Sequence, residues 1–111
     1  MKDRTIAYIN TFVTKDLDAV AAFFADDMRF WDPNLGSRAG AEAVKEAYRE
    51  IFEATGDLSC EVIQVLADGD WTVLEFRLQL GDDAVVGTDV IHWNAEGQIQ
   101  DLRAYVNPPK A

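Results

Sequence analysis

The sequence contains very little cysteine or histidine: Cys60 and His92 are the only residues of their kinds among 111. No disulfide can therefore form within the chain, and no Cys/His cluster can hold a metal, so metal binding would depend on carboxylates alone. Long apolar runs are also missing. The longest, residues 19–25, is far shorter than the roughly 20 residues of a membrane span, and the opening stretch MKDRTIAYINTF lacks a signal peptide's apolar centre. We therefore expect a cytoplasmic protein.

Positive charge is scarce as well. Twenty Asp and Glu residues stand against ten Lys and Arg residues, which gives a net charge of −10 at pH 7. Such a surface repels phosphate backbones and anionic lipid, so we expect neither nucleic acid nor a membrane as a partner. A glycine-rich phosphate loop, a paired-histidine zinc motif and a serine nucleophile elbow are also missing from the sequence, so nothing in it supports a nucleotide-dependent activity.

The hydrophobic residues that are present predict one domain over residues 1–111, because they make up 49% of a chain of this length. The first 55 residues show helical periodicity. A first helix would bury Ile9 and Phe12, with Tyr8 at the edge of the apolar stripe. A second helix would begin at its N-cap Asp16 and end at Asp26–Asp27.

Two further elements are predicted before residue 55. The segment MRFWDP alternates like a strand, with Met28, Phe30 and Asp32 on one side and a proline closing it. Residues 40–54 form a third helix, and Tyr48 lies within its apolar stripe. Helices thus dominate the first half of the chain.

After Gly56 the hydrophobic pattern changes to period two, which indicates strands. Clusters of Gly, Asp and Asn mark three turns at 68–70, 81–83 and 94–97. Helices followed by a strand meander are typical of an α+β fold, in which three N-terminal helices pack on a strongly curved antiparallel sheet that encloses a pocket. The expected strands of the meander span residues 58–67, 71–80, 84–93 and 98–106.

Three residues are candidates for acid–base chemistry in that pocket. Tyr8 is either a core tyrosine or a phenolic donor, and Asp32 is either a turn initiator or a carboxylate at the rim of the pocket. Asp89 is either a solvated surface acid or a buried carboxyl that stays protonated, because no cation is obvious on its side of the strand. A base, a phenol and a neutral carboxyl together suit the removal of a proton beside a carbonyl and the stabilisation of the enolate.

Three segments carry a resemblance to a known family: AYINTFVTKDLDAVAAFFADDMRFWDP, GAEAVKEAYREIF and DVIHWNAEGQIQDLRAYV. They resemble the cone-shaped SnoaL-like superfamily, also called nuclear transport factor 2-like and cystatin-like, over nearly the whole chain. Within it, the sequence is most similar to steroid delta-isomerases, the ketosteroid isomerases. Tyr8 and the Asp32-Pro33 step have the spacing of that family, and Asp89-Val90 occupies the place of its second aspartate.

The resemblance implies roles for these residues and no cofactor. Asp32 would be the general base, Tyr8 and Asp89 would form the oxyanion hole, and Tyr48 would hydrogen-bond Tyr8. The substrate would be a small apolar ketone, steroid-like, whose double bond moves into conjugation. The expected apolar walls of the pocket are Met28, Phe30, Leu74, Phe76, Leu78, Leu102, Ala104 and Val106.

The sequence departs from some family members at Phe24, where they carry a tyrosine, and at Val106, where they carry a large aromatic residue. Two alternatives remain: a polyketide-cyclase-like enzyme using Asp32 on another enolisable ligand, and a non-catalytic small-molecule-binding dimerisation module. The second alternative would be favoured if Phe30 or Trp31 filled the pocket.

The family commonly pairs through the outer face of its sheet, which implies a homodimer here. His92 has the opposite strand parity to Asp89, so it should lie on this outer face. Cys60 is expected to be a small packing residue. The outer-face residues expected at the dimer contact are Trp71, Val73, Val90, His92 and Tyr105.

Overall fold

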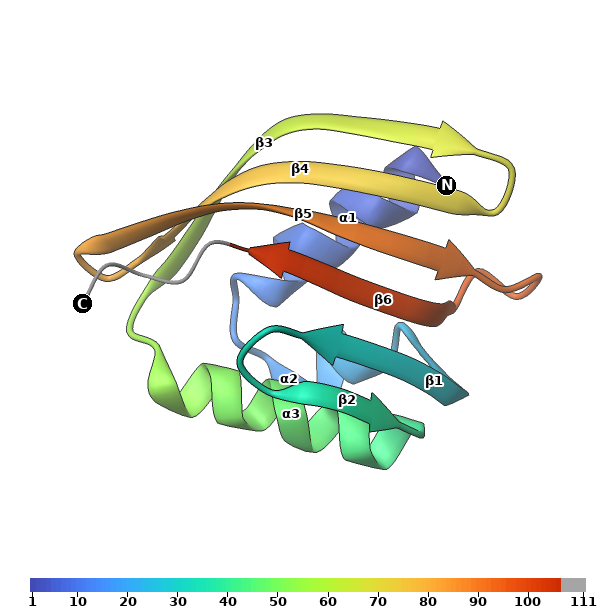
Figure 1. Ribbon diagram of the computed structural model, residues 1–111, viewed down its shortest axis with the longest axis horizontal. Coiled ribbons are helices and arrows are strands. Elements are labelled where there is room, and N and C mark those ends of the chain that lie inside the picture. The colour runs from blue at the N-terminus through green and yellow to red at the C-terminus, as the bar shows by residue number, and fades with distance from the viewer. Residues whose placement is uncertain (107–111) are drawn as a thin grey trace.

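The computed structural model describes residues 1–106, which form an α+β domain (Figure 1). This confirms the predicted fold class. Within the described residues, no helix is long and apolar enough to cross a membrane. The elements in chain order are α1 (Lys2–Phe12), α2 (Leu17–Ala21), β1 (Phe24–Asp32), β2 (Gly36–Ala39), α3 (Ala41–Ala54), β3 (Leu58–Asp68), β4 (Trp71–Leu80), β5 (Asp83–Trp93) and β6 (Ile99–Val106).

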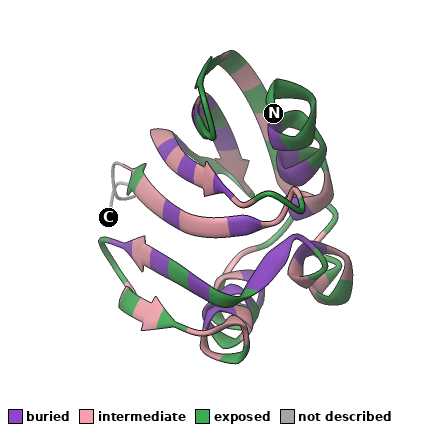
Figure 2. Ribbon diagram, turned by 90° about the vertical axis from the view of Figure 1, so that its right-hand side faces the viewer, coloured by how far each residue is buried: buried purple, intermediate pink, exposed green. Residues whose placement is uncertain are grey.

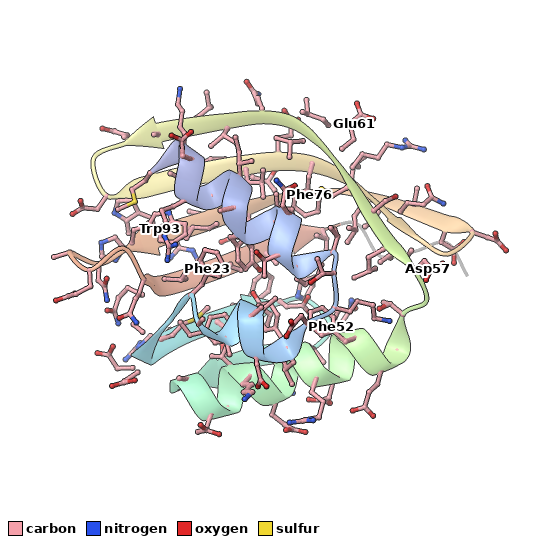
Figure 3. All side chains as sticks on the ribbon, turned by 180° about the vertical axis from the view of Figure 1, so that it is seen from behind. Phe23, Phe52, Asp57, Glu61, Phe76 and Trp93 are labelled. Atoms are coloured by element: carbon pink, nitrogen blue, oxygen red, sulfur yellow. The ribbon has the colours of Figure 1, made fainter. Side chains whose placement is uncertain are left out.

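The strands form one curved sheet in the order β2-β1-β6-β5-β4-β3. Strands β3 to β6 make the predicted antiparallel meander, whereas β1 pairs with β6 in parallel, so the sheet is mixed. The sheet curls around the helices: α1 packs against β3 and β4, and α3 packs against β1 and β2 (Figures 1 and 3). Buried residues alternate with partly or fully exposed ones along much of β4 and β5, which gives the sheet an inner and an outer face (Figure 2).

The second helix is shorter than its sequence predicted. Asp16 is its N-cap, as expected, but α2 ends at Ala21 and not at Asp26–Asp27. The carbonyl oxygen of Phe23 accepts a hydrogen bond of 2.7 Å from the backbone N–H of Ile99. Pairing with β6 therefore draws the chain out of the helix and into β1, and this long-range contact overrides the local helical pattern.

Strand β2 was not predicted. It is a four-residue strand that pairs with β1, with Asp32 opposite Gly36 across the turn. Pro33, Asn34 and Gly36 are typical hairpin residues, and Gly36 has a positive φ of 73°. The signal for the turn was present, but the strand is too short to show a period of two.

Polar contacts attach α1 to the rest of the fold. In the buried interior, the hydroxyls of Thr5 and Thr72 lie 2.8 Å apart, and the indole N–H of Trp93 donates to Thr72 at 2.9 Å. After the helix, the Lys15 ammonium donates to the carbonyl oxygen of Thr55 at 2.5 Å, at the C-terminal end of α3. These contacts hold α1 between the sheet and α3.

Candidate active site

A cavity of about 340 Å³ lies between the inner face of the sheet and helices α1 and α3. Its volume falls toward the lower end of the roughly 300–1,000 Å³ that is typical of small-molecule pockets. Most of the lining is apolar and comes from α1, α3, β1, β4, β5 and β6. The polar or ionisable residues that line it are Tyr8, Asp32, Asn34, Tyr48, Glu50, Thr55 and Asp89.

Two tyrosine hydroxyls meet at one wall of this cavity. Tyr8 from α1 is 2% exposed and Tyr48 from α3 is 1% exposed, and their hydroxyl oxygens lie 2.5 Å apart. The ring of Tyr48 packs against Phe24 and Phe30, with ring centroids 5.1 Å and 5.4 Å away. Burial raises the pKa of both tyrosines above the usual value, so both phenols stay protonated at neutral pH and can donate hydrogen bonds.

Asp32 lies at the end of β1 and is both a turn residue and a cavity residue. Its Oδ1 atom accepts hydrogen bonds from the backbone N–H groups of Asn34 at 2.7 Å and Leu35 at 2.8 Å. The side chain is nevertheless buried and lines the cavity. Both turn hydrogen bonds go to Oδ1, and the Oδ2 atom has no hydrogen-bond partner among residues 1–106. The two alternatives for Asp32 therefore coexist.

Asp89 lies in the middle of β5, opposite Leu74 on β4 and Ala104 on β6. It is 6% exposed and lines the same cavity as Asp32. Desolvation by burial, followed by the negative charge of Asp32, raises the pKa of Asp89 to about 7. A protonated form of Asp89 is therefore present at neutral pH, and this form can donate a hydrogen bond.

The predicted apolar walls divide into two groups. Met28 and Leu74 are fully buried in the core and are not among the cavity-lining residues, because the packed interior covers them completely. The others do line the cavity: Phe30, Phe76, Leu78, Leu102, Ala104 and Val106.

Gly87 shapes the wall beside Asp89 and was not singled out in the sequence. A Cβ atom at this position would lie 2.5 Å from Cγ1 of Val106 and 3.1 Å from Cζ of Phe76. The glycine therefore allows these two cavity-lining side chains to close over β5. A glycine inside an apolar strand is the signal for such a close approach.

Glu50 is another cavity residue that was not singled out in the sequence. It is exposed on α3, and it also lines the cavity. Its carboxylate forms a salt bridge of 3.0 Å with Arg38 on β2. Because β2 was not predicted, an ion pair at this edge of the cavity could not be expected from the sequence.

His92 and Cys60 do not line the cavity. The His92 ring stacks on Trp71, with ring centroids 4.6 Å apart. Cys60 is partly buried against the core, and burial raises the pKa of its thiol to about 11. Trp31 packs against Tyr105, with centroids 5.4 Å apart, so neither it nor Phe30 fills the cavity. Among residues 1–106, no three His, Cys, Asp or Glu side chains form a group that could hold a metal ion.

Comparison with known proteins identifies the family. The model of the SnoaL-like domain family matches residues 5–102. The chain belongs to the SnoaL-like family. No curated protein matches the sequence.

Solved structures share this SnoaL-like fold. A steroid delta-isomerase from Pseudomonas aeruginosa is similar with a TM-score of 0.74 and 25% identity, over 96% of this chain and 78% of that one. An NTF2-like protein of unknown function from Cytophaga hutchinsonii has a TM-score of 0.79 and 18% identity, over 96% and 88% of the two chains. A protein from Silicibacter pomeroyi with a cystatin-like fold has a TM-score of 0.79 and 23% identity, over 97% and 76%.

Proposed function

We propose that this SnoaL-like protein is a steroid delta-isomerase-like enzyme, which moves a β,γ double bond into conjugation with a ketone. One observation carries the proposal: a buried carboxyl with a raised pKa, Asp89, shares an apolar cavity with a second carboxyl, Asp32, and a tyrosine pair. Similarity to the steroid delta-isomerase of Pseudomonas aeruginosa supports it.

Asp32 is the proposed general base. It takes a proton from the carbon between the carbonyl and the alkene, which gives a dienolate, and returns the proton to the far end of the dienolate. The turn hydrogen bonds to Oδ1 hold the carboxylate in place, and Oδ2 remains for the proton transfer. The same group can serve both steps because the proton leaves and re-enters within one cavity.

Tyr8 and Asp89 are the proposed donors to the oxygen on which negative charge develops. In this arrangement the Tyr48 hydroxyl donates to Tyr8, which leaves the Tyr8 hydrogen for the substrate oxygen. Protonated Asp89 donates the second hydrogen bond, whereas its ionised form would repel the oxyanion. Donors that are fixed in an apolar site stabilise the transition state without first having to reorient.

A steroid 5-ene-3-ketone tests the proposal, because isomerisation produces the ultraviolet absorbance of a conjugated enone. We expect turnover by the wild-type protein and a loss of roughly 10² to 10⁴ in rate for Asp32→Asn, the usual contribution of a positioned general base. Asp82→Asn, which removes an exposed carboxylate from a turn, is the matched control and should retain the wild-type rate.

The outcomes separate the alternatives. Turnover that survives Asp32→Asn would contradict the role of Asp32. Absence of turnover on several steroids, together with proton exchange at the α-carbon of other enolisable ketones, would favour a polyketide-cyclase-like activity. Binding of such ketones without exchange or turnover would favour a non-catalytic binding module.

We further propose that the protein is a homodimer paired through the outer face of its sheet. Trp71 and Tyr105 are exposed on this face, with Tyr105 50% exposed. Val73, Val90 and His92 lie beside them, partly buried. Adjacent apolar and aromatic side chains of this kind favour contact with a second copy.

A further inference from the structure

The charges that line the cavity are all of one sign. Among the described residues the ionisable carboxyls are Asp32, Glu50 and Asp89, and no Lys, Arg or His contributes to the lining. Glu50 is neutralised by its salt bridge to Arg38. Asp32 and Asp89 form no salt bridge within residues 1–106. The interior therefore favours cations and disfavours anions.

Asp89 provides a second and independent indication of a ligand. Asp89 is only 6% exposed, it lines the cavity, and its carboxyl makes no hydrogen bond in the described part of the chain. A carboxyl in an apolar site is costly without a partner, and because Asp89 borders the cavity, a ligand there can supply one. The Oδ2 atom of Asp32 is unpaired in the same way. The two carboxyls together have hydrogen-bond acceptor oxygens to which no group of the described residues donates.

We propose that the cavity also binds apolar amines, with the ammonium group held by Asp32 and Asp89 and the hydrocarbon against the apolar wall. An ammonium supplies the hydrogen-bond donors and the positive charge that both carboxylates lack. This ligand class is distinct from the ketone of the proposed isomerase, because it requires the ionised form of Asp89 and involves no reaction.

The two ligand classes depend on pH in opposite directions. The ionisable groups around Asp89 are Asp32 from β1, Tyr8 from α1, Tyr48 and Glu50 from α3 and, outside the cavity, Cys60 from β3. The raised pKa values of both tyrosines and of Cys60 keep these groups neutral up to pH 8. Asp89, with a pKa of about 7, is therefore the group that ionises between pH 6 and pH 8. The affinity of the protein for amines should rise with pH. Its affinity for a ligand that accepts a hydrogen bond, such as a ketone, should not rise.

Three probes with the same adamantane cage test the proposal by isothermal titration calorimetry: 1-aminoadamantane, 1-adamantanol and adamantane-1-carboxylate. At pH 8 we expect the amine to bind at least about tenfold more tightly than the alcohol, and the carboxylate to bind most weakly. Between pH 8 and pH 6 the affinity for the amine should fall roughly tenfold, because each unit below the pKa of Asp89 removes most of its ionised form.

Asp89→Asn should remove both the preference for the amine and its pH dependence, while binding of 1-adamantanol shows that the cavity is intact. Asp82→Asn is the control for the loss of one charge and should bind like the wild type. The proposal is overturned if the amine does not bind, if amine and alcohol bind equally at pH 8, or if Asp89→Asn keeps the preference. Calorimetry needs no turnover, so failure of the isomerase proposal would leave this result unaffected.

Discussion

The two faces of the curved sheet are built from the same strands and carry opposite chemistry. On the inner face, the cavity has carboxyls and no cation among its described lining residues. On the other side, Arg29, Asp101 and Arg103 help to line a hollow of about 380 Å³ against β1, β2 and β6. The guanidinium of Arg103 also lies 5.4 Å from the ring centre of Trp71. Strand alternation thus keeps the cations of β1 and β6 away from Asp89.

Two aspartates show how the presence or absence of a nearby cation changes the pKa of a carboxyl. Asp18 is exposed, and its hydrogen bond of 2.9 Å to the Lys45 ammonium lowers the pKa of its carboxyl. Asp89 is buried without a cation, and desolvation raises its pKa to about 7. The same side chain is therefore a permanent anion in one place and a proton donor in the other.

The largest expected effect is on stability. In the folded protein the pKa of Asp89 is about 7, above the roughly 3.9 of an unfolded chain, so the folded state binds more protons between these values. Its contribution to the unfolding free energy is therefore present below about pH 4 and is lost as pH rises to 7. Asp89→Asn should be more stable than the wild type by up to about 4 kcal/mol at pH 8, with little difference at pH 4.

Urea unfolding of both proteins across this pH range measures the difference. Asp82→Asn again controls for the loss of one negative charge. A gap between wild type and Asp89→Asn that stays constant from pH 4 to pH 8 would show that Asp89 behaves like the exposed acids.

The next effect is on turnover of the proposed isomerase. Asp89→Asn should keep much of the activity at pH 7, because an amide can also donate a hydrogen bond. Asp89→Leu should lose roughly 10² to 10³ by removing a donor to the oxyanion. Wild-type activity should fall as Asp89 ionises above pH 7, and Asp89→Asn should not show this fall. Equal rates for the leucine and asparagine variants would remove Asp89 from the mechanism.

Substitutions on the outer face of the sheet should have the smallest effect on ligand binding in the cavity. Trp71→Glu and Tyr105→Glu place charge on the proposed dimer contact and should give the mass of a monomer in light scattering, whereas the wild type gives that of a dimer. Ile6→Glu, at an exposed apolar position of α1, is the control and should stay dimeric. A monomeric wild type at micromolar concentration would refute the dimer. Binding in the cavity should persist in all three variants, because Ile6, Trp71 and Tyr105 are not among the residues that line it.

Local patterns predicted much of the fold. The strand boundaries of the meander and the third helix agree with the structure within one or two residues, because long periodic segments bury one face whatever their partners are. The end of α2 and the presence of β2 were missed, because both depend on pairing with distant strands. Phe23 bonds to Ile99, and β2 exists only beside β1.

For the candidate site, the sequence identified four polar residues that the structure brings to one cavity, although the strand pattern left open whether Asp89 is buried or solvated. The resemblance to a family brought these four residues together as a site. Tertiary structure alone decided the state of these groups: the partner of the Tyr8 hydroxyl, the atom of Asp32 that the turn uses, and the pKa of Asp89. The physical reason is that periodicity determines which way a side chain points, whereas desolvation and hydrogen bonding depend on residues that folding brings together from distant parts of the chain.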